Sequence, residues 1–403
     1  MAHFVVVGAG QAGSALVARL RANGFDGQIT LIGDEAAPPY QRPPLSKAYL
    51  LGEMELDRLY LRPLEFYAEK DITLRLGQPV TAIDTKAQSL TLGDAVLHYD
   101  ALAFTTGSVP RRLPASAGGD LDGVFTVRTL ADVDAMRDRF KPGARVVIIG
   151  GGYIGLEAAA VAAKMGLEAT VIEMAPRILQ RVASPETANH FRTLHGAHGV
   201  RIIEETGLDQ LIGTDGLSGA VTAARLTSGE EIPCDFVIAG VGILPVTDLA
   251  EAAGCVIENG IRTDEQGRTS VPHLWAAGDC ASFPHKGGRL RLESVGNAID
   301  QAEIVADNMM GAAKNYEAKP WFWSDQFDCK LQIAGLNIGY DRIITRGSGE
   351  AVSFWYYQGD TLLAVDAMND PRAYMVGKRL IEAGRSPDPA AVMEAPDLKA
   401  LLK

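Results

Sequence analysis

Two glycine-rich segments follow the pattern G-x-G-x-x-G, and each comes directly after an apolar run. The first spans residues 8–13 and follows 4–7, and the second spans 150–155 and follows 146–149. In this pattern the first glycine makes the turn from strand to helix and the second lets the backbone approach a pyrophosphate. The third lets helix and strand pack closely. Each segment therefore predicts a strand-turn-helix unit that binds a dinucleotide.

Each glycine segment also has an acidic partner farther along the chain. The apolar run 29–32 leads into Asp34 and Glu35, and the run 169–172 leads into Glu173. These acids lie roughly 20 residues past their glycines, where a carboxylate accepts hydrogen bonds from a ribose. Two complete units predict two dinucleotides, which indicates an enzyme that passes electrons from one to the other.

The composition is that of a soluble globular protein with more than one core. The chain has 403 residues, of which 47% are hydrophobic and 22% charged. This length predicts two or three domains. A net charge of −12 argues against nucleic-acid binding. The longest apolar stretch, 146–163, holds four glycines and Glu157, and no targeting segment precedes the first strand, so we expect a cytoplasmic protein.

The four cysteines do not form a reactive pair in the sequence. They are Cys234, Cys255, Cys280 and Cys329, and no two are spaced as Cys-x-x-Cys. We therefore expect neither a dithiol relay nor a metal site.

The order of patterns predicts an α/β fold with one dinucleotide domain inserted in another. Residues 1–111 and 246–319 are expected to form the first Rossmann-like domain, and 112–245 the second. Strands are predicted at 72–76, 101–105, 236–239 and 273–277, and a helix at 297–310. Residues 320–403 are rich in aromatic and β-branched residues, with turns expected at Gly335, Gly339, Gly347 and Gly359. This last part predicts an α+β domain with an antiparallel sheet and terminal helices.

A proline-rich loop, 38–47, follows the first unit. Its prolines predict an extended, stiff course that presents Arg42 and Lys47. A plain surface connection explains the loop equally well.

Together these motifs resemble a known family. The two glycine segments, the loop Pro43-Pro44-Leu45-Ser46-Lys47, Gly240-Val241-Gly242 and Gly278-Asp279 occur in the order of the flavin-dependent pyridine-nucleotide reductases. Glu293-Ser294-Val295, Asn297-Ala298 and the segment 321–326 narrow the resemblance to the NADH-dependent ferredoxin reductases of bacterial oxygenase systems, of the putidaredoxin reductase type. The resemblance covers nearly the whole chain.

The resemblance implies an FAD site and an NADH site. The residues implied for FAD are Gly8, Gly10, Gly13, Asp34 or Glu35, Arg42, Lys47, Arg128, Asp279, Ser294, Val295 and Trp323. Those implied for NADH are Gly150, Gly152, Gly155, Glu173 and Gly242. Lys47 and Glu157 are implied as a catalytic pair, in which the lysine stabilises reduced flavin and the glutamate orients the lysine.

Simpler roles remain open for several of these residues. Asp279 could cap a helix, Trp323 could belong to a core, and Gly242 could serve a turn. Arg42 and Arg128 could be surface cations, and Glu157 could sit in a helix first turn because the macrodipole favours it there.

The implied partner is an acidic 2Fe-2S ferredoxin that supplies an oxygenase. A basic rim of Arg62, Lys286, Arg289 and Arg291 is the expected docking surface on a monomer or weak dimer. Glu303 departs from this picture, because a cation there would suit an acidic partner better. The alternatives are reduction of rubredoxin or of a small one-electron acceptor, and a non-catalytic NADH-sensing role.

Overall fold

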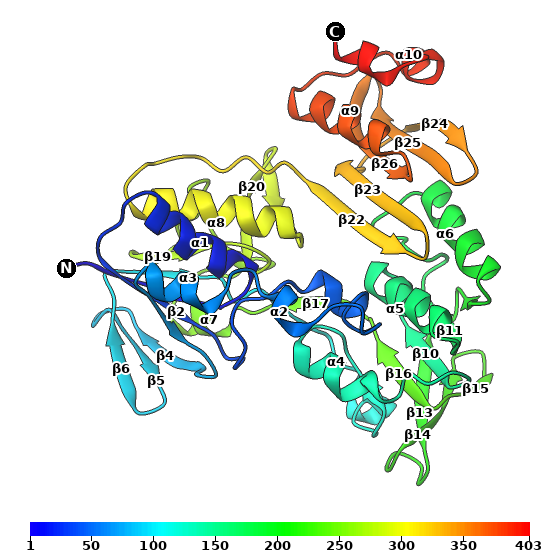
Figure 1. Ribbon diagram of the computed structural model, residues 1–403, viewed down its shortest axis with the longest axis horizontal. Coiled ribbons are helices and arrows are strands. Elements are labelled where there is room, and N and C mark those ends of the chain that lie inside the picture. The colour runs from blue at the N-terminus through cyan, green and yellow to red at the C-terminus, as the bar shows by residue number, and fades with distance from the viewer. The chain divides into compact units, whose positions relative to one another are not determined.

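The computed structural model describes residues 1–403, and its chain forms two compact units (Figure 1). Unit 1 comprises Met1–Arg42, Glu55–Val109 and Leu244–Pro320. Unit 2 comprises Pro43–Met54, Pro110–Ile243 and Trp321–Lys403. The predicted three-domain division stays a prediction. It differs from the two units in two ways. The segments expected as the second and third domains fall together in unit 2, and Pro43–Met54, expected in the first domain, also belongs to unit 2.

Unit 1 is built on a five-stranded parallel sheet. The order is β19 (Leu274–Ala276), β7 (Ala101–Phe104), β1 (His3–Val7), β2 (Gln28–Ile32) and β3 (Ile72–Arg75). The strand residues are mostly buried, as expected for parallel strands that are covered on both faces. The predicted strands at 72–76, 101–105 and 273–277 and the predicted helix at 297–310 are present to within two residues.

Helices and two small sheets complete unit 1. The helices are α1 (Gln11–Ala22), α2 (Leu56–Leu59), α3 (Leu64–Glu69), α7 (Asp248–Ala252) and α8 (Val295–Met309). The small sheets contain β4 (Val80–Asp84), β5 (Ser89–Leu92) and β6 (Ala95–His98), and β18 (Ile261–Arg262), β20 (Ala281–His285) and β21 (Gly288–Leu290). The chain passes between the units within β8 (Ser108–Pro110) and β17 (Ile243–Pro245).

Unit 2 repeats the same parallel design. Its sheet has the order β12 (Arg201–Ile203), β11 (Glu168–Ile172), β10 (Arg145–Ile149), β16 (Phe236–Ala239) and β9 (Val124–Phe125). A second, antiparallel sheet is formed by β13 (Leu208–Gly213), β14 (Val221–Leu226) and β15 (Glu231–Pro233), which follow β12 in the chain and precede β16. The helices are η2 (Ala115–Ala117), α4 (Leu130–Arg137), α5 (Tyr153–Lys164) and α6 (Pro185–Ala197).

The C-terminal part of unit 2 is a five-stranded antiparallel sheet with helices. The order is β22 (Trp321–Gln326), β23 (Cys329–Gly335), β26 (Thr361–Met368), β25 (Ala351–Gln358) and β24 (Arg342–Ser348). The helices α9 (Pro371–Glu382), α10 (Pro389–Glu394) and η3 (Leu398–Leu402) follow. The predicted α/β class, with two Rossmann-like sheets and a C-terminal antiparallel sheet, is confirmed.

Three local predictions are wrong. Gly335 is the last residue of β23, paired with Ala364, and the turn follows at Ile338 and Gly339. Gly347 lies inside β24 at φ +80°, paired with Val352, and the turn falls at Gly349 and Glu350. The segment Pro43–Ser46 forms a 3₁₀ turn, η1, rather than an extended course, and the Lys47 N–H donates to the Pro44 carbonyl at 3.0 Å. A proline φ near −65° suits a helical first turn as well as an extended chain, so the sequence alone could not decide.

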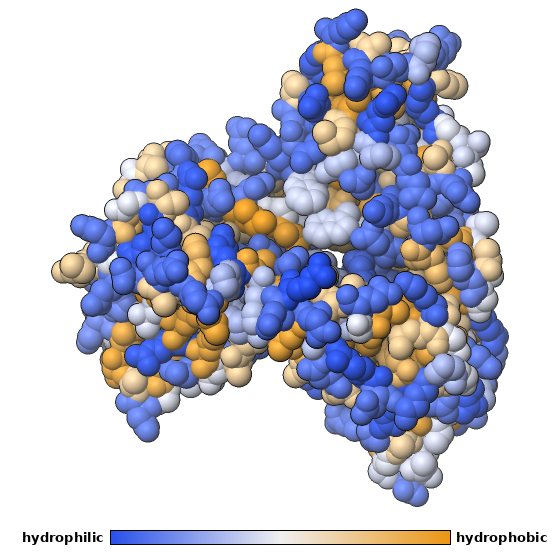
Figure 2. All heavy atoms as spheres, in the orientation of Figure 1, coloured by the Kyte–Doolittle hydropathy of each residue, from blue (hydrophilic) through white to orange (hydrophobic).

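The surface carries apolar side chains in scattered groups. The face seen in Figure 2 is mostly hydrophilic, with apolar atoms interrupted by charged residues. No helix is both long enough and apolar enough to cross a bilayer.

A buried carboxylate ties α1 to α8 in unit 1. Asp307 on α8 has a side-chain exposure of 4%, and it accepts from Arg19 Nε at 2.7 Å and from Asn23 Nδ2 at 2.5 Å. Lys314 Nζ lies 2.7 Å from its other oxygen. The Arg19 hydrogen bond, above all, holds the pKa of Asp307 well below its ordinary value. The tie fixes α1, the helix that begins at the first glycine segment.

We expect Asp307→Asn to lower the free energy of unfolding by about 2 kcal/mol, because hydrogen bonds to charged groups contribute roughly 1.5–3 kcal/mol. A lowered pKa means that the stabilisation is present above the unfolded-state pKa, about 3.9, and is lost as the pH falls below it. Urea unfolding of both proteins at pH 7, 5 and 4 measures the difference. Lys314→Met, which removes a half-exposed cation, should change stability far less. Identical urea midpoints for Asp307→Asn and wild type would contradict the role of this tie.

Candidate functional site

The first glycine segment forms a tight cradle at the carboxyl end of β1. Gly8 has φ +118°, and a Cβ there would lie 2.2 Å from the Thr105 carbonyl oxygen. A Cβ on Gly13 would lie 2.0 Å from the Gly8 oxygen, whereas a Cβ on Gly10 would meet nothing within 4 Å. Gly10 also caps α1 without any side-chain hydrogen bond. Open space beside free helix N–H groups is what a pyrophosphate needs.

The second glycine segment repeats this geometry in unit 2. Gly150 has φ +108°, and a Cβ there would lie 2.4 Å from the Gly240 oxygen. A Cβ on Gly155 would lie 2.1 Å from the Gly150 oxygen, and Gly152, the uncapped start of α5, faces open space. The two cradles thus fit two dinucleotides, each within its own unit.

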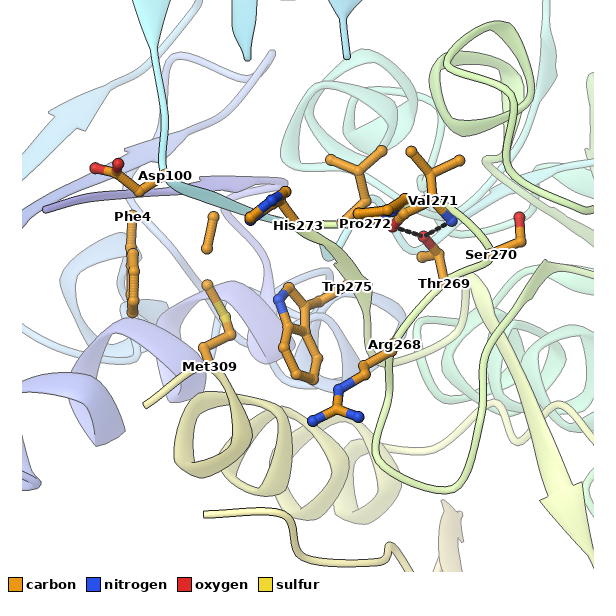
Figure 3. A pocket seen from close by; sticks show the side chains of 12 residues that line it. Phe4, Asp100, Arg268, Thr269, Ser270, Val271, Pro272, His273, Trp275 and Met309 are labelled. Atoms are coloured by element: carbon orange, nitrogen blue, oxygen red, sulfur yellow. Dashed lines mark hydrogen bonds between the residues drawn. The ribbon is translucent and has the colours of Figure 1, made fainter. Parts of the chain in front are cut away.

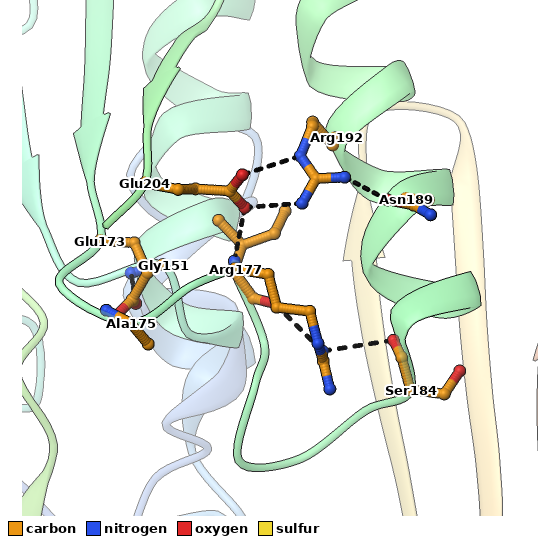
Figure 4. A network of polar contacts seen from close by, with 9 residues as sticks. Gly151, Glu173, Ala175, Arg177, Ser184, Asn189, Arg192 and Glu204 are labelled. Atoms are coloured by element: carbon orange, nitrogen blue, oxygen red, sulfur yellow. Dashed lines mark hydrogen bonds and ion pairs between the residues drawn. The ribbon is translucent and has the colours of Figure 1, made fainter. Parts of the chain in front are cut away.

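The Glu173 carboxylate is held by backbone donors at the end of β11 (Figure 4). Its Oε2 accepts from the Gly151 N–H and its Oε1 from the Ala175 N–H, both at 2.8 Å. Each oxygen keeps a lone pair for a further donor. A Cβ on Gly151 would lie 2.6 Å from Ile178 Cγ2, so this middle glycine, which the motif left unspecified, is also required.

The two arginines after Glu173 differ in their surroundings. Arg177 donates to backbone carbonyls of its own loop. It donates to Ala183 at 2.8 Å and to Ser184 at 3.3 Å (Figure 4). Arg181 is exposed and makes no ion pair, and its Nη2 is 3.7 Å from the position of a Cβ on Gly242. Arg177 is therefore a loop-folding residue, and Arg181 lies with Arg111 beside Gly242.

The acids of the first unit are not equivalent. Glu35 Oε1 accepts from Arg42 Nη2 at 2.7 Å, and its Oε2 accepts from Tyr40 Oη at 2.5 Å. Asp34 is exposed, and one of its oxygens accepts from the Glu35 N–H at 3.1 Å. The structure thus gives Arg42 and Glu35 each other as partners and leaves Asp34 the more accessible acceptor.

Asp279 follows β19 at the same sheet edge as Gly8. Ser108 Oγ donates to Asp279 Oδ2 at 2.9 Å. A Cβ on the preceding Gly278 would lie 3.1 Å from the Ala12 Cβ, which places Asp279 beside the start of α1. Ser294 is the N-cap of α8 and accepts from the Asn297 N–H at 3.2 Å, with Val295 next to it. Ser108 was not among the predicted site residues, because it belongs to none of the motifs.

Lys47 and Glu157 meet in unit 2, as the resemblance implied. Lys47 Nζ lies 2.9 Å from Glu157 Oε1, and the two side chains are 18% and 6% exposed. Ser46 Oγ donates to Glu157 Oε2 at 3.0 Å, and Ser324 Oγ donates to Oε1 at 2.7 Å. Burial raises the pKa of Glu157, while the Lys47 charge and both hydroxyls act in the opposite direction. Glu157 is thus a buried carboxylate surrounded by donors, which a plain helix first-turn role does not require.

Two further implied FAD residues also lie in unit 2. Arg128 directly precedes Thr129, the N-cap of α4, and its backbone N–H donates to Asp132 at 3.0 Å. Trp323 lies on β22 with its ring 5.4 Å from that of Trp321, and it is partly exposed. Partial exposure argues against a pure core role for Trp323.

Three of the four implied docking cations are engaged within unit 1. Arg62 Nη1 donates to Ser14 Oγ at 2.8 Å. Arg289 donates to the Thr263 carbonyl at 2.9 Å, and Arg291 lies 2.5 Å from Glu293. Lys286 is exposed and makes no ion pair. The four do not form one patch of free charges, although each remains a cation.

A separate cavity of about 380 Å³ lies at the amino ends of β1, β7 and β19 (Figure 3). Phe4, Trp275 and Met309 give it apolar walls, and the Arg268 guanidinium lies 5.4 Å from the Trp275 ring centre. The glycine cradle and Asp279 lie at the carboxyl ends of these strands. The cavity is therefore not part of the dinucleotide site.

The cysteines take no part in the site. Cys234, Cys255, Cys280 and Cys329 are all buried free thiols, and burial raises the pKa of each. No group of three or more His, Cys, Asp or Glu side chains is arranged to hold a metal ion.

Comparison with known proteins agrees with these sites. Residues 2–302 match the pyridine nucleotide-disulphide oxidoreductase family and residues 321–402 match the reductase C-terminal family. The chain is 43% identical to a ferredoxin–NAD(P)(+) reductase of a Sphingomonas species, covering 94% of this chain and 92% of that protein. It is 42% identical to putidaredoxin reductase of Pseudomonas putida, covering 94% and 91%.

A solved structure gives the same relationship. The chain matches the crystal structure of the covalent putidaredoxin reductase–putidaredoxin complex with a TM-score of 0.95 at 40% identity, covering 100% of this chain and 98% of that one. Members of the matching oxidoreductase family bind FAD and use NAD(P)H, as both cradles allow. The predicted family is confirmed: the chain belongs to the pyridine nucleotide-disulphide oxidoreductases, among the ferredoxin–NAD(P) reductases of the putidaredoxin reductase type.

Proposed function

We propose that this protein takes a hydride from NADH and passes electrons singly to a 2Fe-2S ferredoxin that supplies an oxygenase. The observation that carries the proposal is the repeated glycine cradle, one in each unit, together with the buried Lys47–Glu157 pair. A cytoplasmic location and a monomeric or weakly dimeric state are parts of the same proposal.

The proposed FAD residues of unit 1 are those of the first cradle and its surroundings. Gly8, Gly10 and Gly13 provide the turn and the free helix N–H groups for the pyrophosphate. Asp34 accepts from the adenosine ribose, and the Glu35–Arg42 pair stiffens that loop. Asp279 and the start of α8 at Ser294 and Val295 border the same edge of the unit. The resemblance assigns Lys47, Arg128 and Trp323 of unit 2 to this cofactor as well.

Bound FAD supplies the conversion of a two-electron hydride donor into a one-electron donor. The proposed role of Lys47 is electrostatic: its positive charge would stabilise the reduced, electron-rich flavin. Glu157 holds Lys47 in place, and the Ser46 and Ser324 hydroxyls hold Glu157. All four groups are buried or nearly so, which strengthens their electrostatic interactions relative to water.

Glu173 is the proposed determinant for NADH. A carboxylate fixed by two backbone N–H groups accepts from a ribose 2′-hydroxyl and repels a 2′-phosphate. Arg177, which could hold a 2′-phosphate, is committed to the carbonyls of its loop. Arg181 and Arg111, which both lie beside Gly242, remain as cations of this unit that could compete.

Local positive charge is the proposed basis for ferredoxin docking despite the net charge of −12. Lys286 is the cleanest residue to probe, because Arg62, Arg289 and Arg291 have internal partners. Reversing those arginines would disturb unit 1 as well as any docking.

We expect wild type to prefer NADH over NADPH by tenfold or more in kcat/KM, a discrimination of at least about 1.4 kcal/mol. Glu173→Ala should narrow the preference, because the repulsion of a 2′-phosphate is removed. Steady-state kinetics with both donors measures the ratio. Glu168→Ala, an exposed glutamate at the other end of β11, should leave it unchanged. Equal efficiency of wild type with NADPH would refute the assignment.

Lys47→Ala should slow reduction of the bound flavin by NADH by about tenfold or more. The reason is the loss of a stabilisation by the nearby positive charge, for which we expect about 1.4 kcal/mol of activation free energy. Stopped-flow absorbance at the flavin band measures this step. The flavin potential should also fall, with FAD content retained. Lys164→Ala, which removes an exposed lysine paired with Glu53 at 3.2 Å, is the matched control. Wild-type rates for Lys47→Ala would make the lysine structural only.

NADH-driven reduction of a 2Fe-2S ferredoxin should slow as KCl rises from low to physiological strength, where the Debye length is about 8 Å. Flavin reduction by NADH should change little. Lys286→Glu should raise the apparent KM for ferredoxin, and Lys330→Glu on β23 should not. If every 2Fe-2S ferredoxin from the same source fails while a small acceptor is reduced briskly, the proposed acceptor is wrong.

A further inference from the structure

A buried chain of polar side chains leads from α6 through β22 to Glu157, all within unit 2. His195 Nε2 is 2.8 Å from Gln326 Oε1, and Gln326 Nε2 donates to Ser324 Oγ at 3.0 Å. Ser324 Oγ donates to Glu157 Oε1 at 2.7 Å. His195 and Ser324 are fully buried, and Gln326 is 1% exposed. None of these three residues belongs to either glycine cradle.

The strand geometry brings the two β22 residues to the same face. Ser324 and Gln326 are two positions apart, so their side chains point the same way, while Asp325 between them is exposed. The strand packs against α5, the helix that carries Glu157. The C-terminal sheet therefore contributes a hydroxyl to a carboxylate that belongs to the second dinucleotide unit.

The chain has a single consistent direction. An ionised carboxylate only accepts, so Ser324 must give its proton to Glu157 and must itself accept from the Gln326 amide. The Gln326 oxygen then accepts from His195 Nε2–H, which leaves the proton off Nδ1, a buried atom with no hydrogen-bond partner. Burial lowers the pKa of His195 to about 4, which agrees with a neutral ring. Every donor of the chain points toward Glu157.

The other groups around Glu157 act in the same direction or are neutral. Lys47 and Ser46 donate from the segment that begins with η1, and they are the remaining polar partners of the carboxylate. Tyr153, one turn earlier on α5, has a pKa raised well above its ordinary value by burial, so it stays an uncharged phenol. Loss of the Ser324 donor would leave the carboxylate with Lys47 and Ser46 as its polar partners.

We propose that Ser324, backed by Gln326 and His195, is a positioning residue that holds the Glu157 carboxylate against Lys47. Through it, the C-terminal sheet controls the Lys47–Glu157 pair. The inference rests on the proposed function only in so far as this pair serves the reaction with NADH. The competing explanation is that the chain merely ties β22 to α5.

The test uses the FAD-loaded full-length protein and the variant Ser324→Ala. Flavin reduction by NADH, followed by stopped flow from pH 5 to 9, should be about tenfold slower at neutral pH, the effect of one lost hydrogen bond to a charged group. Removing a donor raises the pKa of Glu157 further, so the acid side of the pH profile should move to higher pH. Ser324→Thr, which keeps the hydroxyl, should restore both the rate and the profile.

A second measurement does not depend on turnover. In protein with ¹³C-labelled glutamate side chains, the carboxyl signal that disappears in Glu157→Gln identifies Glu157. Its titration midpoint should move to higher pH in Ser324→Ala and stay in place in Ser324→Thr. Gln326→Leu, which removes the donor behind Ser324, should move the midpoint in the same direction by less. Ser353→Ala, another fully buried serine of the same sheet, is the control and should leave Glu157 unchanged.

The possible results separate the explanations. If Ser324→Ala keeps the wild-type rate, pH profile and Glu157 titration, the positioning role is overturned and the chain is only a structural tie. If Ser324→Ala does not fold, Ser324→Cys, of similar shape with a weak donor, replaces it and the same criteria apply. Failure of ferredoxin reduction in wild type would overturn the proposed acceptor but leave these measurements valid, since they concern only Glu157 and the step with NADH.

Discussion

The architecture depends on two places where backbone approaches backbone too closely for any side chain. At Gly8 and at Gly150 an added Cβ would lie within 2.4 Å of a carbonyl oxygen from the neighbouring parallel strand. A similar contact recurs at the third glycine of each segment, where Gly13 packs on Gly8 and Gly155 packs on Gly150. These contacts bring the start of each helix down onto its sheet edge and leave its N–H groups free. The dinucleotide sites are consequences of this packing.

The second requirement is to satisfy Glu157, a carboxylate buried in an apolar helix. An unpaired buried charge is strongly destabilising, and three donors from two separate segments contact this carboxylate. Ser46 and Lys47 come from the 3₁₀ turn and the residue after it, and Ser324 comes from the C-terminal sheet. The Glu157 carboxylate would destabilise the fold if it were unpaired. Because it is paired, it links α5, the segment with Ser46 and Lys47, and the C-terminal sheet within unit 2.

The protein has no thiol pair near its sites, although its family is named for disulphide chemistry. The C-terminal sheet supplies an oriented hydroxyl at Glu157 instead. In unit 1, the Asp307 tie between α1 and α8 serves a different purpose, since it fixes the helix that starts at the first cradle. Charged groups in this protein thus both fix a helix in unit 1 and form the buried Lys47–Glu157 pair in unit 2.

The sequence predicted both cradles, their acids, the parallel strands and the antiparallel C-terminal sheet, because these depend on local spacing and periodicity. It also pointed to Lys47 and Glu157 through a resemblance, although these residues are 110 positions apart. The fold was needed to show that Glu35 pairs with Arg42, that Arg177 donates to carbonyls of its own loop, and that Arg62, Arg289 and Arg291 have internal partners. It also revealed Ser108 and Ser324 as donors to acids 171 and 167 positions away. The physical reason is that a hydrogen bond between distant segments leaves no periodic trace in the chain, whereas a turn, a strand or a helix start must be encoded where it occurs.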